Sequence, residues 1–174
     1  MIPLILAVAV TLAPSVPSVP SVPPVPPPRS GQWRWPLSPV PAVIRTFDPP
    51  STPWGAGHRG VDLAAAPGRP VYAAGTGRVS FAGHVAGYGV VAITHGRVRT
   101  TYLPVEPSVR VGRPVAAGTR IGTVQDRPGH CGLRHCLHWG LRHGLLYLDP
   151  LSLLRFQVRL LPIWPPSSPS PYLH

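Results

Sequence analysis

The stretch GRPVYAAGTGRVSFAGHVAGYGVVAITHG, residues 68–96, decides the fold. It contains three short runs rich in valine, tyrosine, phenylalanine, isoleucine and threonine, at residues 70–75, 77–83 and 89–96, and glycines separate these runs. Such residue types favour strands, whereas glycine at the end of a run is typical of a turn. The stretch therefore predicts consecutive β-strands joined by tight turns.

The same composition continues toward the C-terminus. The runs RVRTTYLP (97–104), TRIGTVQ (119–125) and CLHWGLR (136–142) predict three more strands. Between Trp33 and Phe156 no window of a dozen residues shows a helical apolar period, and DPLSLLRF (149–156) alone predicts a turn or two of helix. We expect one all-β domain over residues 31–156, a glycine-rich antiparallel sandwich or barrel-like fold with little helix.

The segments on either side of this domain have a different composition. Residues 1–13 are apolar over about three helical turns and predict a secretory signal peptide, too short to span a bilayer. Residues 14–30 form a proline-rich repeat that predicts a disordered linker of polyproline type. Residues 157–174 are again rich in proline and predict a disordered tail.

The net charge of +11 arises from 16 basic residues, all arginine, against five acidic ones. Attraction to a polyanion is one interpretation; coding by GC-rich DNA, which also accounts for the lack of lysine and asparagine, is another. The arginines are scattered rather than gathered on one helix or interleaved with aromatic residues, so we expect no nucleic-acid partner. An anionic cell-wall polymer fits the charge equally well.

Two separated groups of residues could bind a metal. The segment HCGLRHCLHWGLRHG (130–144) holds four histidines and both cysteines, and strand alternation places Cys136 and His138 on one face. His58 and Asp62, separated by three residues and set among glycines, form a second group. His138 would complete a His-Asp-His set, and three protein ligands with a fourth position open are typical of catalytic zinc.

These motifs, with GQWRWPL, VRVGRPVAAGTRIGTV and YLDPLSLL in the same order and spacing, resemble the lysostaphin-like, LytM-type zinc metallopeptidases. The resemblance covers nearly the whole domain. It implies the fold called the duplicated hybrid motif, export, and zinc-activated attack of water on peptide cross-links of peptidoglycan. It also implies Zn²⁺ ligands at His58, Asp62 and His138.

The sequence departs from the family at both positions that usually carry a catalytic histidine without binding zinc. Cys136 and Pro104 occupy them. Because a positioned acid or base contributes about 10²- to 10⁴-fold, we expect a substitute. His130 is the leading candidate, with His135 and Glu106 behind it, and Tyr102 is a candidate to stabilise the oxyanion.

Cys136 has three interpretations. A disulfide with Cys131 is favoured by the expected export and the even number of cysteines. Alternatively, Cys136 is a fourth, thiolate ligand that closes the zinc site, or it is a free thiol beside the metal.

The sequence therefore predicts an exported, monomeric zinc endopeptidase of the cell wall that binds peptidoglycan or another anionic wall polymer. The alternative is a catalytically silent zinc-bearing module that binds the wall or regulates another wall hydrolase. Loss of both catalytic histidines favours the alternative, and retention of all three ligands favours the enzyme.

Overall fold

The computed structural model describes residues 33–52, 55–127, 131–132 and 134–154. The predicted signal peptide (1–13), linker (14–30) and tail (157–174) lie outside these residues. The described elements, in chain order, are β1 Val43–Arg45, β2 Gly60–Ala64, β3 Pro70–Tyr72, β4 Gly77–Val85, β5 Tyr88–His95, β6 Val98–Leu103, β7 Val105–Pro107, β8 Pro114–Val115, β9 Arg120–Val124, β10 Cys136–His143, β11 Leu146–Leu148 and the 3-10 helix η1 Pro150–Leu154.

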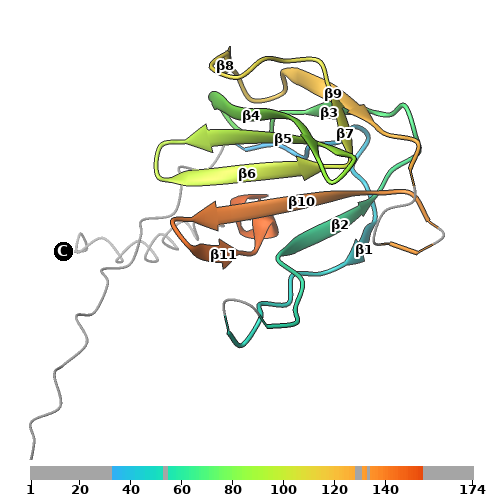
Figure 1. Cartoon of the computed structure of the whole chain (residues 1–174), viewed down its shortest axis with the longest axis vertical. Helices are drawn as coiled ribbons and strands as arrows, with labels where there is room; N and C mark the ends of the chain where they lie inside the picture. The colour runs from blue at the N-terminus through green and yellow to red at the C-terminus, as the bar shows by residue number, and fades with distance from the viewer. Residues whose placement is uncertain (1–32, 53–54, 128–130, 133, 155–174) are drawn as a thin grey trace, which may run out of the picture.

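The strands form two antiparallel sheets. The larger has eight strands in the order β1-β2-β10-β6-β5-β4-β8, with β11 paired to β10, and the smaller has three in the order β3-β9-β7 (Figure 1). The all-β, antiparallel prediction is confirmed. All six predicted runs form strands, and the segment predicted as helix forms η1.

One apolar core joins the two sheets. Trp139, Leu63 and Ile93 of the larger sheet and Val71 and Ile121 of the smaller sheet belong to the same cluster of buried side chains, and each is fully buried. Burying a large apolar side chain of this kind contributes roughly 1.5–3 kcal/mol. The core therefore fixes the smaller sheet against one face of the larger one.

Tight turns set the register of the central strands. The β4–β5 hairpin turns at Ala86 and Gly87, both with positive φ (50° and 83°), and Val85 pairs with Tyr88 across it. Two successive residues with positive φ are characteristic of the two-residue hairpin turns whose twist matches that of the flanking strands. The glycine-rich stretch predicted from the sequence thus becomes a meander of paired strands.

Alternation along β10 separates core residues from those that face away from the core. Leu137, Trp139 and Leu141 are buried in the core, so Cys136 and His138 lie on the opposite face of the sheet. This second face carries the candidate site. Among the described residues, the structure contains no helix long and apolar enough to cross a membrane.

Candidate metal centre

Two neighbouring strands bring two of the predicted ligands together. In the antiparallel pairing of β2 with β10, Asp62 lies directly opposite His138. Residues directly opposite on one face have Cβ atoms about 4.5–5.5 Å apart, which is close enough for both side chains to reach one ion. Residues 76 positions apart in the chain therefore share a site.

His58 reaches the same point from the segment before β2. An isolated antiparallel bridge joins His58 to Asp48, with backbone N–H groups donating in both directions over 2.6 and 3.0 Å. This bridge fixes the backbone of His58, which lies four residues before Asp62, although no helix connects the two residues. The backbone bridge to Asp48 therefore positions His58 next to Asp62, as the predicted pair requires.

The three side chains converge on one another. His58 Nε2 lies 3.1 Å from Asp62 Oδ1 and 3.2 Å from His138 Nδ1, and His138 Nδ1 lies 2.9 Å from Asp62 Oδ1. The side chains of His58 and Asp62 are 5% and 1% exposed, whereas that of His138 is 14% exposed. The cluster is thus buried on two sides and open to solvent beside His138.

A backbone carbonyl outside the predicted site orients His58. Its Nδ1 lies 2.6 Å from the carbonyl oxygen of Thr46, which can only accept. The Nδ1–H therefore donates to Thr46, and the lone pair of Nε2 faces the other two side chains. A carbonyl that fixes the tautomer of a ligand histidine in this way is a common partner in metal sites. Sequence reasoning missed Thr46, since a carbonyl carries no residue-type signal.

The donor atoms fit zinc. Ligand bonds of about 2.0–2.2 Å in a tetrahedron separate neighbouring donor atoms by about 3.3–3.6 Å, within a few tenths of an ångström of the separations here. Two unprotonated imidazole nitrogens and a carboxylate oxygen are ordinary zinc donors. The arrangement leaves a fourth position, as an open site requires.

Cys131 and Cys136 form a disulfide, as predicted. Their sulfur atoms and a carboxylate oxygen of Asp62 all lie within 4.8 Å of one another, so the disulfide borders the ligand set. A sulfur atom engaged in a disulfide has no thiolate to offer a metal. In this state the alternatives of a fourth, thiolate ligand and of a free thiol are excluded.

The structure does not support the predicted role of Tyr102 in stabilising an oxyanion. Tyr102 lies opposite Trp139 in the β6–β10 pairing, on the core face, and is fully buried. Its hydroxyl oxygen accepts a hydrogen bond from the backbone N–H of Ala74 over 2.9 Å. The hydroxyl therefore points away from His138, which lies on the other face of the sheet.

Glu106 and His135, two of the predicted proton carriers, do not join the cluster. Glu106 belongs to β7 of the smaller sheet, where Gln125 donates to its carboxylate over 2.9 Å. His135 Nε2 lies 3.9 Å from Asp126 Oδ1. His130 is outside the described residues, so its role remains a prediction.

The sequence is similar to a family model and to several known proteins. A sequence model of peptidase family M23 matches residues 56–150. Rv2891, an uncharacterized protein of Mycobacterium tuberculosis, is 51% identical over 135 residues, which are 74% of this chain and 54% of that protein. YgeR, an uncharacterized lipoprotein of Escherichia coli, is 32% identical over 70% of this chain and 47% of its own. The chain spans about half the length of these curated relatives.

Solved structures share the fold. The catalytic domain of lysostaphin from Staphylococcus simulans aligns with a TM-score of 0.56 at 22% identity, over 66% of this chain and 92% of that domain. Csd3 of Helicobacter pylori aligns with a TM-score of 0.54 at 30% identity, over 69% of this chain and 33% of that one. A zinc-containing peptidase of Vibrio cholerae aligns with a TM-score of 0.57 at 22% identity, over 70% of this chain and 39% of that one.

Proposed function

This chain belongs to peptidase family M23, and we propose that it is an exported zinc endopeptidase that hydrolyses peptide cross-links of peptidoglycan. The observation that carries the proposal is the convergence of His58, Asp62 and His138 on one point at the open face of the larger sheet. The family's peptidase activity supports the reaction class. The substrate is proposed from the resemblance to lysostaphin-like enzymes.

The three clustered side chains would hold the metal, with one nitrogen from each histidine and one oxygen from Asp62. A bound zinc ion supplies Lewis-acid polarisation of a peptide carbonyl and activates a water molecule as the nucleophile. The chain itself contributes orientation and charge. Thr46 fixes the ring of His58, the carboxylate of Asp62 offsets part of the cation's charge, and the exposed edge of His138 admits substrate.

Export is proposed on two grounds. Residues 1–13 have the length and apolarity of the apolar region of a secretory signal peptide. The Cys131–Cys136 disulfide is a bond that persists in oxidising compartments and is rare in a reducing cytosol. Both agree with action at the cell wall, where peptidoglycan or another anionic polymer would be the partner.

A second function is favoured by one observation, the chemistry at positions 104 and 136. Pro104 has no side-chain proton to transfer, and the sulfur of Cys136 is covalently engaged. A zinc-bearing module that binds the wall without cutting it, or that regulates another hydrolase, needs no general base. If the protein is instead the proposed endopeptidase, His130, which directly precedes Cys131, is the predicted base.

One experiment separates the two functions. Purified protein is incubated with peptidoglycan over a range of pH, and released amines and bound zinc are measured in the same preparation. For the enzyme we expect about one zinc per chain and release of amines, with both lost in His138→Ala and both retained in His84→Ala, a change at an exposed histidine of β4.

The outcomes are distinct. Zinc bound without amine release at any pH would reject the enzyme and leave the silent module. Loss of amine release in His130→Ala, with zinc content unchanged, would identify His130 as the proton carrier. Unchanged release in that variant would remove His130 while leaving the metal mechanism intact.

A further inference from the structure

A row of polar side chains crosses the larger sheet at a distance from the metal centre. In the pairing of β5, β6, β10 and β11, Thr94 lies opposite Arg99, Arg99 opposite Arg142, and Arg142 opposite Tyr147. Directly opposite residues share a face. The two arginines therefore point to the same side of the sheet from neighbouring strands.

Neither arginine of the pair forms an ion pair with another residue of the described part of the chain. Like charges directly opposite on paired strands destabilise a sheet. Among the described residues, the side chain of Arg99 makes no hydrogen bond or ion pair, and that of Arg142 donates to the carbonyl of Gly144 over 2.9 and 3.2 Å. An anion between the two guanidinium groups would remove this repulsion.

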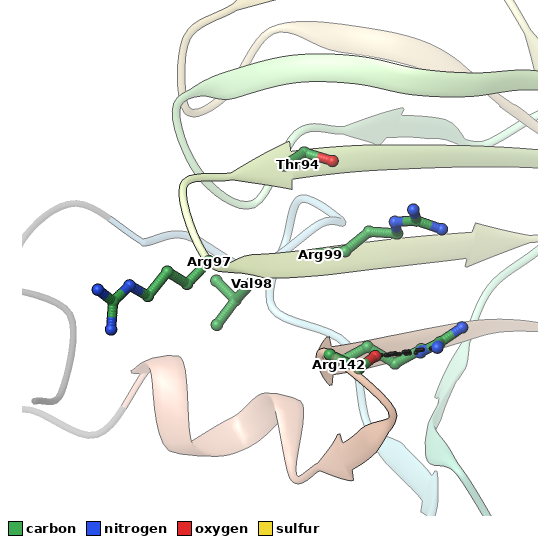
Figure 2. Close-up of a pocket in the computed structure, with 6 residues that line it drawn as sticks. Thr94, Arg97, Val98, Arg99 and Arg142 are labelled. Atoms are coloured by element: carbon green, nitrogen blue, oxygen red, sulfur yellow. Dashed lines mark hydrogen bonds between the residues drawn. The ribbon is translucent and has the colours of Figure 1, made fainter. Parts of the chain in front are cut away.

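The surroundings form a pocket of suitable size. A cavity of about 220 Å³ is lined by Thr94, Arg97, Val98, Arg99, Arg142 and Gly144 (Figure 2). The ring of Tyr147 lies 5.5 Å from the guanidinium carbon of Arg59 and 5.4 Å from that of Arg142. Tyr147 therefore places a third positive charge, that of Arg59, near Arg142. Stacking on an aromatic ring limits the movement of an arginine side chain. The pocket is thus small, positively charged and partly rigid.

The pair is aligned with the metal centre. Arg142 and His138 are four residues apart on β10, so both lie on the same face about 13 Å from one another along the strand. Figure 2 shows the guanidinium groups of Arg99 and Arg142 extending toward the arrowhead end of β6, which is the end that lies beside His138. The guanidinium groups of Arg99 and Arg142 therefore lie closer to His138 than their backbones do, whereas the side chain of Arg97 points in the other direction.

We propose that Arg99 and Arg142 form a subsite for a carboxylate of the substrate peptide, two to four extended residues from the bond that is cut. The proposal rests on the proposed function, because it places the reacting bond at His58, Asp62 and His138. An extended chain covers about 3.3–3.6 Å per residue, which matches this separation. Paired guanidinium groups suit a carboxylate, since Arg99 offers a planar fork of N–H donors and Arg142 adds the N–H groups that do not bond Gly144.

A peptide carboxylate is favoured over the phosphates of another wall polymer by this alignment. A polymer attracted by charge alone would need no particular position relative to His138. A subsite on the strand that carries a metal ligand instead fixes one distance between the anionic group and the scissile bond. That fixed distance makes the subsite a specificity device for the peptide.

The test uses the full chain and cross-linked peptide fragments released from peptidoglycan, either native or with their carboxylates converted to amides. Binding to zinc-free protein is measured by calorimetry. We expect native fragments to bind about tenfold or more tightly than amidated ones. The double variant R99Q/R142Q should bind native fragments only as tightly as amidated ones.

Two matched variants control for charge and geometry. Arg120→Gln removes an exposed arginine of β9, on the smaller sheet, and should bind like the wild type. R99K/R142K keeps both charges but loses the forked donors, and we expect an intermediate affinity. In zinc-loaded protein, R99Q/R142Q should raise KM for native fragments and leave kcat unchanged.

Equal affinity for native and amidated fragments, or an equal loss in Arg120→Gln, would overturn the subsite. Competition by inorganic polyphosphate that is as strong in R99Q/R142Q as in the wild type would assign phosphate binding to other arginines and would leave the subsite intact. Hydrolysis with wild-type KM in R99Q/R142Q would reject the subsite and keep the proposed function. Binding of native fragments that depends on Arg99 and Arg142, without hydrolysis of any fragment, would support the subsite and reject the proposed endopeptidase.

Discussion

At the level of single residues, Gly60 controls how closely the ligand strands approach. It lies opposite Gly140 in the β2–β10 pairing, and a Cβ added at Gly60 would be 2.6 Å from His138 Nε2 and 2.5 Å from the carbonyl oxygen of Trp139. No real Cβ atom tolerates such distances, and the carbonyl cannot move without disturbing the sheet. The ring of His138 therefore lies where only glycine leaves room.

Gly60→Ala should consequently weaken metal binding and stability together. We expect zinc affinity to fall by about 10- to 100-fold, the range seen when the support of a metal ligand is lost. Isothermal titration with zinc and thermal unfolding measure both effects. Gly83→Ala on β4, where an added Cβ meets only ordinary contacts at 3.5 Å or more, is the matched control. Equal zinc affinity in the two variants would contradict this role.

A second residue-scale feature is the environment of His95. Its Nδ1–H donates to the carbonyl of Thr76 over 2.9 Å, and its Nε2 lies 2.8 Å from the hydroxyl oxygen of Thr100. Burial lowers the pKa of His95 below its ordinary value of 6.5, although the bond to Thr76 opposes this shift. The neutral ring is therefore the form that suits the folded protein.

The sign of the resulting pH dependence follows from linkage. A lowered pKa means that the unfolded chain binds the proton more readily, so the stabilising contribution of His95 is complete above pH 6.5 and declines as the pH falls through the folded-state pKa. We expect His95→Gln to flatten the loss of unfolding free energy as the pH falls below 6.5. Denaturant unfolding across this range measures the slope. An unchanged slope in the variant would show that other groups control it.

Some residues of the candidate site could be predicted from the sequence and others could not. His58, Asp62 and His138 were identified from spacing and family resemblance because their types and intervals carry the chemistry. Tyr102 was misplaced because its face depends on the register of β6 against Trp139 of β10, which only the folded sheet reveals. The carbonyl of Thr46 had no signal at all.

At the level of elements, most strands of five or more residues were predictable and most shorter strands were not. The runs that became β5, β6 and β9 are rich in valine, threonine and isoleucine. The missed strands are β1, β2, β7, β8 and β11, and all of them except β2 span only two or three residues. β7 and β8 each contain a proline. Such strands form because neighbouring strands offer paired backbone groups, which is a tertiary effect that local preference does not record.

The loop closed by Cys131 and Cys136 leads to an element-scale prediction. A dithiol reductant would break the S–S bond and leave two thiols near Asp62, while the dithiol itself becomes a disulfide. A freed thiolate could then occupy the fourth ligand position. We expect cobalt-loaded, reduced protein to show a thiolate-to-cobalt charge-transfer band in the near ultraviolet that the oxidised protein lacks.

Two cysteine variants make this prediction specific. Cys131→Ser should show the band without reductant, because Cys136 is then a free thiol. C131S/C136S should show none while still binding cobalt through the histidines and Asp62. Absence of the band in reduced wild-type protein and in Cys131→Ser would mean that the loop holds the sulfur away from the metal.

At the level of the whole molecule, Tyr102 joins the two sheets. Its ring is fully buried within β6 of the larger sheet, and its hydroxyl oxygen accepts from the backbone N–H of Ala74, just after β3 of the smaller sheet. The hydroxyl group of Thr100 lies 2.9 Å away on the same strand. Burial raises the pKa of Tyr102 to about 12, so the phenol stays protonated at any working pH.

Tyr102→Phe distinguishes this structural role from the catalytic one that the sequence suggested. The variant leaves the buried N–H of Ala74 without an acceptor, which costs about 1–3 kcal/mol of unfolding free energy. Because the hydroxyl lies on the core face, we expect kcat at low temperature and zinc content to match the wild type. Denaturant unfolding and peptidoglycan hydrolysis, measured on the same preparations, check both expectations. A fall in kcat of a hundredfold or more with unchanged stability would return Tyr102 to the reaction, and would require the β6–β10 register to differ from the one described here.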